Sequence, residues 1–278
     1  MKTSILLTLH DREPAVLMNT FRSLYRAGLN DDEEVVIVDD RSEQDLQWAH
    51  NLAKASFKNV VWKRIDEYPA YEIAGFRNPS RSFNEALSAA TGESVWIMSS
   101  DILVTPGCIQ RARQIKTDEM IWTPRIVDLE SCMEYVGQNR LFPMPWFLVA
   151  SKQKAIDVGG WDETYLQGMC YEDNDFVGRL ALATGCFAGE WSRVAYHQSH
   201  NQPAYAIDDP GIREANERNR QWTQEKWGGI PFDSELTPFD VVREMHVSGI
   251  PVHRVIEKSN KLERVIGLTK GMFARATA

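Results

Sequence analysis

Continuous apolar runs alternate with segments of helical period through the first hundred residues of the chain. The apolar runs predict buried strands at 5–9, 35–38, 60–65 and 95–98. Strands that alternate with helices at this spacing are typical of a mainly parallel sheet with helices on both faces. The pattern therefore predicts an α/β fold.

The helices between these strands carry start and stop signals. Pro14 begins one helix, which Gly28 ends, and Pro79 begins another. Between them, Ser42 with Asp45 three residues later resembles a capping box. This pair predicts a further helix through about residue 55.

The pattern is less regular after residue 106. Apolar runs at 120–127 and 146–150 predict two more strands. A helix is expected from about 173 to 183, because Phe176 recurs on its apolar face and Gly185 follows as a stop. The sheet therefore continues into the second half of the chain.

The last part of the chain differs in character. Pro210 begins a polar helix that reaches about residue 227, whereas 231–278 show no clear period and end in a basic segment. For this basic end, a solvated tail is favoured over a membrane-surface or oligomer contact. We expect one domain over 1–205 and a mainly helical C-terminal appendage over 206–278.

Composition and charge narrow the class of protein. The chain has 31 basic and 39 acidic side chains, hence a formal net charge of −8, which disfavours nucleic acid as the main partner. No apolar run approaches the roughly 20 residues needed to span a bilayer. The apolar start of the chain is too short for a signal peptide, and its four cysteines show no zinc spacing. These features predict a cytoplasmic protein with reduced thiols, and peripheral contact with a membrane surface is the alternative.

Polar residues gather where the predicted strands end, which is where open α/β sheets bind ligands. Asp39 and Asp40 end the second strand, and Thr8 and Arg12 follow the first. The carboxylates either cap the strand end or accept hydrogen bonds from a nucleotide. Residue types alone leave both roles open.

A second carboxylate ends the fourth strand. Asp101 follows Ser99 and Ser100 there, and a carboxylate in a ligand crevice suits a hard divalent cation. Neutral imidazole also binds Mn²⁺-like ions, so His197 is a candidate second ligand and His200 the competing one. A lone Asp or His is more often structural, and that alternative also stays open.

The most acidic stretch of the chain lies at the start of the predicted 173–183 helix. Glu172, Asp173 and Asp175 follow the Gly159-Gly160 segment by about twelve residues. A helix N-terminus favours acidic side chains through its free N–H groups and its dipole. The same carboxylates are also candidates for acid–base chemistry.

Taken together, these segments resemble family 2-type glycosyltransferases, which have the GT-A fold. Five segments carry the resemblance, in the order that the family has them: 35–42, 84–93, 99–101, 159–163 with 172–175, and 196–198. The resemblance implies a Rossmann-like, mainly parallel sheet that binds a nucleoside diphosphate-sugar, with UDP-sugar favoured. It further implies transfer of the sugar to a glycan or other hydroxyl-bearing acceptor, with Mn²⁺ or Mg²⁺ as cofactor and inversion at the anomeric carbon.

The resemblance also assigns roles to residues. It implies Asp173 as general base, Glu172 as orienting residue, and Asp101 with His197 as metal ligands. Trp161 and Asp175 would contact the acceptor, with Asp175 as the alternative base and Trp146 as a further stacking candidate. The nucleotide-binding residues would be Thr8, Arg12, Asp39, Asp40, Arg81, Asn84 and Ser100.

Two positions depart from the family pattern. Ser99 stands where relatives carry the first acid of an Asp-x-Asp motif, which removes one charge from the metal site. Phe83 stands where many relatives carry an arginine, so that Arg77 or Arg81 would have to supply the charge. These departures motivate a non-catalytic nucleotide-sugar-binding module as one alternative. A nucleotidyltransferase is the other, although residues 10–14 lack the Gly-rich basic loop expected of one.

Overall fold

The structure is a computed structural model that describes residues 2–65, 67–73, 76–136, 146–200, 209–232, 239–247, 250–257 and 261–270. Its strands are β1 Thr3–Leu9, β2 Glu33–Asp39, β3 Val60–Arg64, β4 Glu72–Ile73, β5 Phe76–Arg77, β6 Ser94–Ser99, β7 Ile102–Leu103, β8 Ile121–Asp128, β9 Glu134–Val136, β10 Phe147–Ser151, β11 Cys186–His197, β12 Phe239–Val247 and β13 Ile250–Glu257. Its helices are α1 Pro14–Ala27, α2 Gln47–Ser56, α3 Ser80–Ala89, α4 Pro106–Ala112, α5 Lys152–Asp157, the 3₁₀ helix η1 Glu163–Gln167, α6 Glu172–Thr184, α7 Pro210–Trp227 and α8 Lys261–Leu268.

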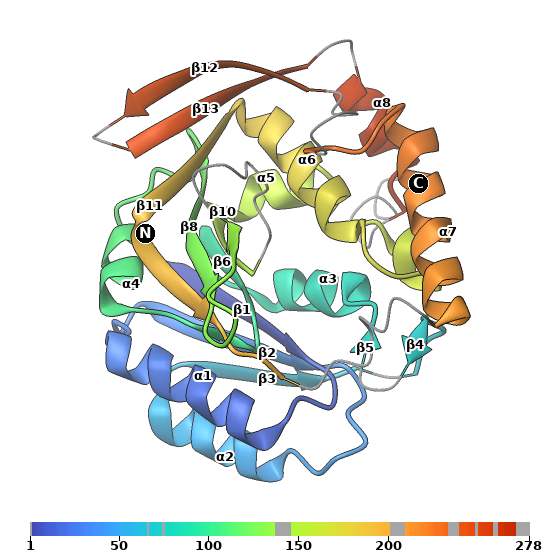
Figure 1. The fold of residues 1–278 in the computed structure, drawn as a ribbon. Helices are drawn as coiled ribbons and strands as arrows, with labels where there is room; N and C mark the ends of the chain where they lie inside the picture. Colours follow the sequence, from blue (N-terminus) through green and yellow to red (C-terminus); the bar gives the residue numbers. More distant parts are fainter. Residues whose placement is uncertain are drawn as a thin grey trace.

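One large mixed sheet runs through the molecule in the order β12-β13-β11-β8-β10-β6-β1-β2-β3. The strands β6, β1, β2 and β3 are parallel to one another, and β10 then runs antiparallel to both β6 and β8. Figure 1 shows α1 and α2 on one side of the parallel strands and α3, α6 and α7 on the other. The predicted α/β fold with helices on both faces is confirmed.

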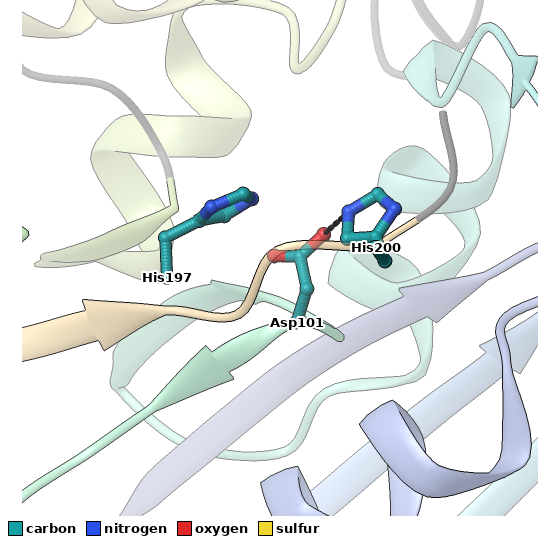
Figure 2. Close-up of side chains that lie close together, drawn as sticks. All are labelled: Asp101, His197 and His200. Atoms are coloured by element: carbon teal, nitrogen blue, oxygen red, sulfur yellow. Dashed lines mark hydrogen bonds and ion pairs between the residues drawn. The ribbon is translucent and has the colours of Figure 1, made fainter. Parts of the chain in front are cut away.

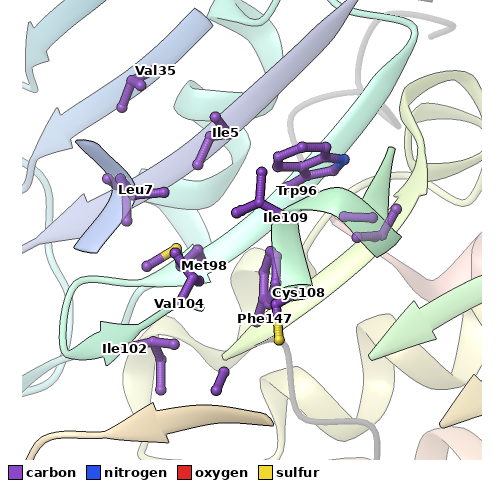
Figure 3. Packing of buried hydrophobic residues seen from close by; sticks show 14 of the residues in the cluster. Ile5, Leu7, Val35, Trp96, Met98, Ile102, Val104, Cys108, Ile109 and Phe147 are labelled. Carbon is purple, nitrogen blue, oxygen red and sulfur yellow. The ribbon is translucent and has the colours of Figure 1, made fainter. Parts of the chain in front are cut away.

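Alternate residues of the central strands supply two separate cores. In β1, Ile5 and Leu7 face the core under α1, α2 and α4, whereas Leu6 faces the core under α3 and α6. The side chains of β6 alternate in the same way, with Trp96 and Met98 on the first side (Figure 3). Both faces are apolar because both are covered, which is why these strands read as continuous apolar runs in the sequence.

Most helix boundaries lie where the sequence signals put them. Pro14 begins α1, and Gly28 and Gly185 end α1 and α6 in the left-handed conformation at φ 72° and 75°. The predicted capping box is wrong. Helix α2 begins at Gln47, and the Gln47 N–H donates a hydrogen bond to the Asp45 carboxylate at 2.9 Å. Ser42 instead accepts a hydrogen bond from the Asp11 N–H.

The described parts of 206–278 join the rest of the molecule rather than standing apart. The β12–β13 hairpin, which the sequence pattern did not predict, continues the main sheet because β13 pairs antiparallel with β11. Helix α7 runs from Pro210 to Trp227, as predicted, and Trp227 is buried in the same core as Phe176. The described segments after residue 205 thus pair with the main sheet and pack on its core.

Within the described residues, none of the helices has the length and apolar character that crossing a bilayer requires.

Candidate active site

A cleft of about 210 Å³ opens at the carboxyl ends of β1 and β6. It is lined by the loops that follow these strands, by the segment around the start of α3, and by the turn that begins α6. Its lining residues are Thr8, Leu9, His10, Arg12, Asp40, Phe76, Arg77, Pro79, Ser82, Phe83, Ser99, Ser100, Asp101, Trp146, Met169, Cys170, Tyr171, Glu172, Asp173, Asn174 and His197. The cleft therefore lies where a ligand is expected in an open α/β sheet.

Asp101, His197 and His200 form a cluster that fits a divalent cation. Each offers one ligand atom, and these atoms lie within 4.8 Å of one another. Figure 2 shows Asp101 between the two imidazoles, with His200 Nε2 3.1 Å from Asp101 Oδ2. One carboxylate and two imidazoles form a mixed oxygen and nitrogen donor set that suits a Mn²⁺-type ion.

His197 is held in place by Asp128, a residue that the sequence analysis did not identify. His197 Nδ1 lies 2.8 Å from Asp128 Oδ2, and the Ser131 N–H and the Ser199 hydroxyl donate to the same carboxylate. Because Nδ1 contacts Asp128, Nε2 is the nitrogen that would face a metal ion, the arrangement in which a carboxylate orients a ligating histidine. The pairing could not be seen in the sequence, because it depends on the β8–β11 register that sets His197 opposite Asp128.

Asp101 also carries an ion pair with Arg12. Arg12 Nη2 is 3.1 Å from Asp101 Oδ2, and Arg12 Nε donates to the Ser100 hydroxyl at 3.2 Å. Burial alone would raise the pKa of Asp101, but Arg12 and the neighbouring histidines outweigh it and lower that pKa to about 2. Asp101 is therefore an ionised ligand at every physiological pH.

Two carboxylates, Glu172 buried and Asp173 half-buried, enter the cleft from the start of α6. Glu172 and Asp173 follow Cys170 and Tyr171, which both have positive φ values of 61° and 68°. Such a conformation is costly for residues with a side chain, and it persists only when the surroundings hold it. Here the Asn219 side chain of α7 donates to the Cys170 carbonyl at 2.9 Å.

The negative charges of these two carboxylates are poorly compensated by neighbouring groups. Burial, together with the charge of Asp173, raises the pKa of Glu172, and burial raises the pKa of Asp173 well above the ordinary carboxyl range. The Trp161 indole N–H opposes the rise in the pKa of Asp173 only in part, and no described residue forms a hydrogen bond of normal geometry with Asp173 Oδ1. A carboxylate that lines a cleft with an unsatisfied oxygen and a raised pKa is suited to general base catalysis near neutral pH.

The opposite end of the predicted nucleotide site is organised by Arg77. Its guanidinium donates to Asp40 Oδ1 at 2.9 Å and lies over the Tyr68 ring at 4.4 Å, while the Tyr68 hydroxyl donates to Asp40 Oδ2 at 2.6 Å. Burial raises the pKa of Asp40 in spite of these partners. Of the two arginines considered as substitutes at the Phe83 position, Arg77 lines the cleft and Arg81 does not.

The cleft brings together most of the residues predicted for the site. Those that line it are Thr8, Arg12, Asp40, Ser100, Asp101, Glu172, Asp173 and His197. Three predicted nucleotide ligands lie outside its lining, because each is engaged in the protein. The Asp39 carboxylate accepts hydrogen bonds from the Arg64 guanidinium and from the Ser42 N–H.

Arg81 and Asn84 are the other two. Arg81 pairs with Glu85 at 2.8 Å, and the Asn84 amide exchanges two hydrogen bonds with the Trp161 backbone, at 2.8 and 2.9 Å. Asn84 therefore fastens α3 to the Gly159-Gly160-Trp161 segment. It contributes to the site by positioning this segment rather than by lining the cleft.

The two predicted acceptor contacts also lie in the interior. The Trp161 ring is fully buried between Phe83 and Phe176, with centroid distances of 4.7 and 3.6 Å. Asp175 is fully buried against Arg179 and Lys226. Trp146 does line the cleft, where it stacks on the His197 ring at 5.1 Å.

Comparisons with known proteins agree with this architecture. The chain is similar to a crystal structure of S. aureus TarS 1-349 in complex with UDP-GlcNAc, with a TM-score of 0.64 and 14% identity over 81% of this chain and 65% of that one. The complex of TarS 1-349 with UDP matches with a TM-score of 0.59 and 16% identity over 72% and 61% of the two chains. GalNAc-T7 with UDP, GalNAc and Mn²⁺ matches with a TM-score of 0.60 and 11% identity over 82% and 49%. The chain thus matches less than two thirds of the length of each of these proteins.

The fold and the position of the cleft define a GT-A type α/β protein, as the sequence resemblance implied. Residues 4–120 match the family described as glycosyl transferase family 2. In sequence this segment, less than half of the chain, is therefore similar to that family, and the fold is of the GT-A type. No curated protein sequence is a significant match to it.

Proposed function

We propose that this protein is a metal-dependent glycosyltransferase, which moves a sugar from a nucleoside diphosphate-sugar to an acceptor hydroxyl. The observation that carries the proposal is that one cleft is lined both by Asp101 and His197 of the candidate cation site and by a carboxylate pair with raised pKa values, Glu172 and Asp173. Both suit glycosyl transfer, because charge develops on the leaving diphosphate while a proton leaves the acceptor. The UDP and UDP-GlcNAc complexes of the TarS structures favour a UDP-sugar as donor.

In this proposal each wall of the cleft has its own task. Asp101, His197 and His200 would hold Mn²⁺ or Mg²⁺, which supplies Lewis-acid stabilisation of the diphosphate. Thr8, Asp40 and Arg77 line the part of the cleft proposed for the nucleoside. The Ser100 hydroxyl accepts a hydrogen bond from Arg12 and so keeps this cationic side chain beside the proposed metal ligands.

The chemical step is assigned to the start of α6. Asp173 accepts the proton of the acceptor hydroxyl, whose oxygen forms the new bond to the anomeric carbon as the bond to the diphosphate breaks. Glu172, buried beside it, keeps the charge of the pair low and orients the acceptor. Attack from the face opposite the leaving group with a single base gives inversion at the anomeric carbon.

The test is to incubate the protein with a panel of UDP- and GDP-sugars and Mn²⁺ and to measure released nucleoside diphosphate. Release that is lost in Asp173→Asn and loses its metal dependence in Asp101→Ala would support the proposal. The anomeric configuration of the product, read by NMR, tests inversion.

This assay, together with a second one that supplies a nucleoside triphosphate and a sugar phosphate, separates the alternatives. If a donor binds but no donor is hydrolysed or transferred, the protein is a nucleotide-sugar-binding module, which Ser99 in the metal motif favours. If pyrophosphate is released from a nucleoside triphosphate and a sugar phosphate, it is a nucleotidyltransferase.

A further inference from the structure

The Arg12 guanidinium covers two members of the cation cluster at once. Arg12 Nη2 lies 3.1 Å from Asp101 Oδ2, and Arg12 Nη1 lies 2.7 Å from His200 Nε2. The side chains are largely enclosed, with exposed fractions of 17% for Arg12, 7% for Asp101 and 3% for His200. A protein cation therefore occupies the carboxylate that a metal ion would use.

A guanidinium and a divalent cation repel each other when both contact the same carboxylate. Metal-to-oxygen distances are about 2.0–2.2 Å for such ions, so an ion held by Asp101 and His200 would lie close to Arg12. The repulsion between them is strong in an enclosed site, where water screens little. Because Ser99 replaces the first acid of the motif, this position adds no second negative charge that would offset Arg12.

The charges balance only when a diphosphate is present. Arg12 and Asp101 neutralise each other in the free protein, so a divalent cation alone would leave two positive charges in excess. A nucleoside diphosphate removes that excess, and it also offers Arg12 a new partner within the same cleft. Arg12 can reach it, since its side chain lines the cleft while its backbone is fixed by the Gln44 amide.

We propose that Arg12 is an internal counter-cation of Asp101. When the metal ion and the donor bind, Arg12 releases the Asp101 carboxylate to the metal and pairs with the donor's diphosphate instead. Metal and nucleotide then bind cooperatively, and each binds weakly alone. The identity of the diphosphate rests on the proposed function, whereas the competition between Arg12 and the metal does not. In this role Arg12 is a positioning residue that makes metal binding conditional on the donor.

The experiment measures Mn²⁺ affinity by electron paramagnetic resonance of free Mn²⁺, without nucleotide and with saturating UDP. The variants are Arg12→Gln, which removes the charge, and Arg12→Lys, which keeps it. The matched control is Arg22→Gln, since Arg22 is an exposed arginine on α1. Asp101→Asn, in each background, shows whether the measured ion is bound at this site.

Without nucleotide, Arg12→Gln is expected to bind Mn²⁺ about tenfold more tightly than the unaltered protein, while Arg12→Lys and Arg22→Gln stay near its affinity. UDP should tighten Mn²⁺ binding about tenfold or more in the unaltered protein and much less in Arg12→Gln. Equal or weaker Mn²⁺ affinity in Arg12→Gln, or equal coupling to UDP in both proteins, overturns the proposal. Sugar transfer is assayed separately, so that coupling without transfer would refute the proposed function alone.

Discussion

At the residue scale, the site depends on side chains whose partners fix their chemical state. Asp128 determines which nitrogen of His197 faces the metal position, and Arg12 keeps Asp101 ionised. Glu172 and Asp173 show the opposite arrangement, since burial without a strong cationic partner keeps them close to neutral. The same residue type is therefore ionised in one environment, where a metal ligand is proposed, and has a raised pKa in the other, where the base is proposed.

Asp128→Asn tests the orientation of His197. An amide cannot accept the Nδ1 proton with the strength of a carboxylate, so we expect Mn²⁺ affinity in the presence of UDP to fall about 10–100-fold. Calorimetric titration of Mn²⁺ measures this change. Glu134→Gln serves as control because Glu134 pairs with Arg125 on the neighbouring strand and does not line the cleft. Equal losses in the two variants would contradict the role of Asp128.

Asp173→Asn should lose transfer and gain stability. The unfolded pKa of Asp is about 3.9, and burial raises the folded pKa of Asp173 to about 7. The folded protein therefore binds more protons between these values, so that its stability falls as pH rises from about 4 to 7 and stays reduced above.

The gain on replacing Asp173 should thus be of order 1–2 kcal/mol at pH 8 and vanish near pH 4. Urea unfolding at both pH values measures it. In the unaltered protein, transfer should decline as pH falls below about 7, because the base becomes protonated. A variant that is less stable than the unaltered protein at pH 8 would contradict the buried, uncompensated state of Asp173.

At the scale of elements, the sequence predicted the features that depend on local patterns, such as the ends of helices. Pro14, Gly28 and Gly185 marked helix ends because these residues act through their own backbones. The β12–β13 hairpin was missed, since its pattern is set by pairing with β11 rather than by a local period. Contacts between elements also explain why Trp161 and Asp175, which were expected at the acceptor, lie in the interior. The local sequence does not show this packing.

Helix α7 holds the strained turn that aims α6 at the cleft. Asn219 donates to the Cys170 and Tyr165 carbonyls, at 2.9 and 3.1 Å. Asn219→Ala should remove this donor from the Cys170 carbonyl, whereas the Tyr165 carbonyl keeps Asn78, and it should let the turn relax, lowering kcat about tenfold or more. Steady-state kinetics measures the loss, while Mn²⁺ binding should remain near that of the unaltered protein. Gln221→Ala on the exposed face of the same helix is the control, and equal kinetics in both variants would refute this role.

At the scale of the whole molecule, a buried charge cluster joins the acidic end of α6 to the C-terminal helices. Lys226 of α7 lies 2.8 Å from both Asp162 and Asp175, and it also donates to Thr269 beyond α8. Arg179 completes the pairing of Asp175 at 2.6 Å. These groups are fully enclosed, so their charges depend on one another rather than on water.

Lys226→Met should therefore destabilise the protein strongly. It leaves buried Asp162 without its cation and Asp175 with Arg179 alone, and breaking a buried ion pair costs about 3–5 kcal/mol. Lys116→Met removes a cation from an exposed pair with Glu119 and should cost at most about 1 kcal/mol. Urea unfolding at pH 7 compares the two variants, and similar stabilities would contradict the structural weight of the cluster.

The course of the chain through the sheet has a consequence for how the protein is made. The strands β1, β2, β3 and β6 and their helices come from the first hundred residues, which emerge from the ribosome first. Asp101 and Arg12 are then already present, but His197, His200 and Asn219 are not yet synthesised. A partly made chain thus contains both members of the ion pair before the residues proposed to complete the cation site and Asn219, so that the proposed site is complete only after synthesis has passed α7.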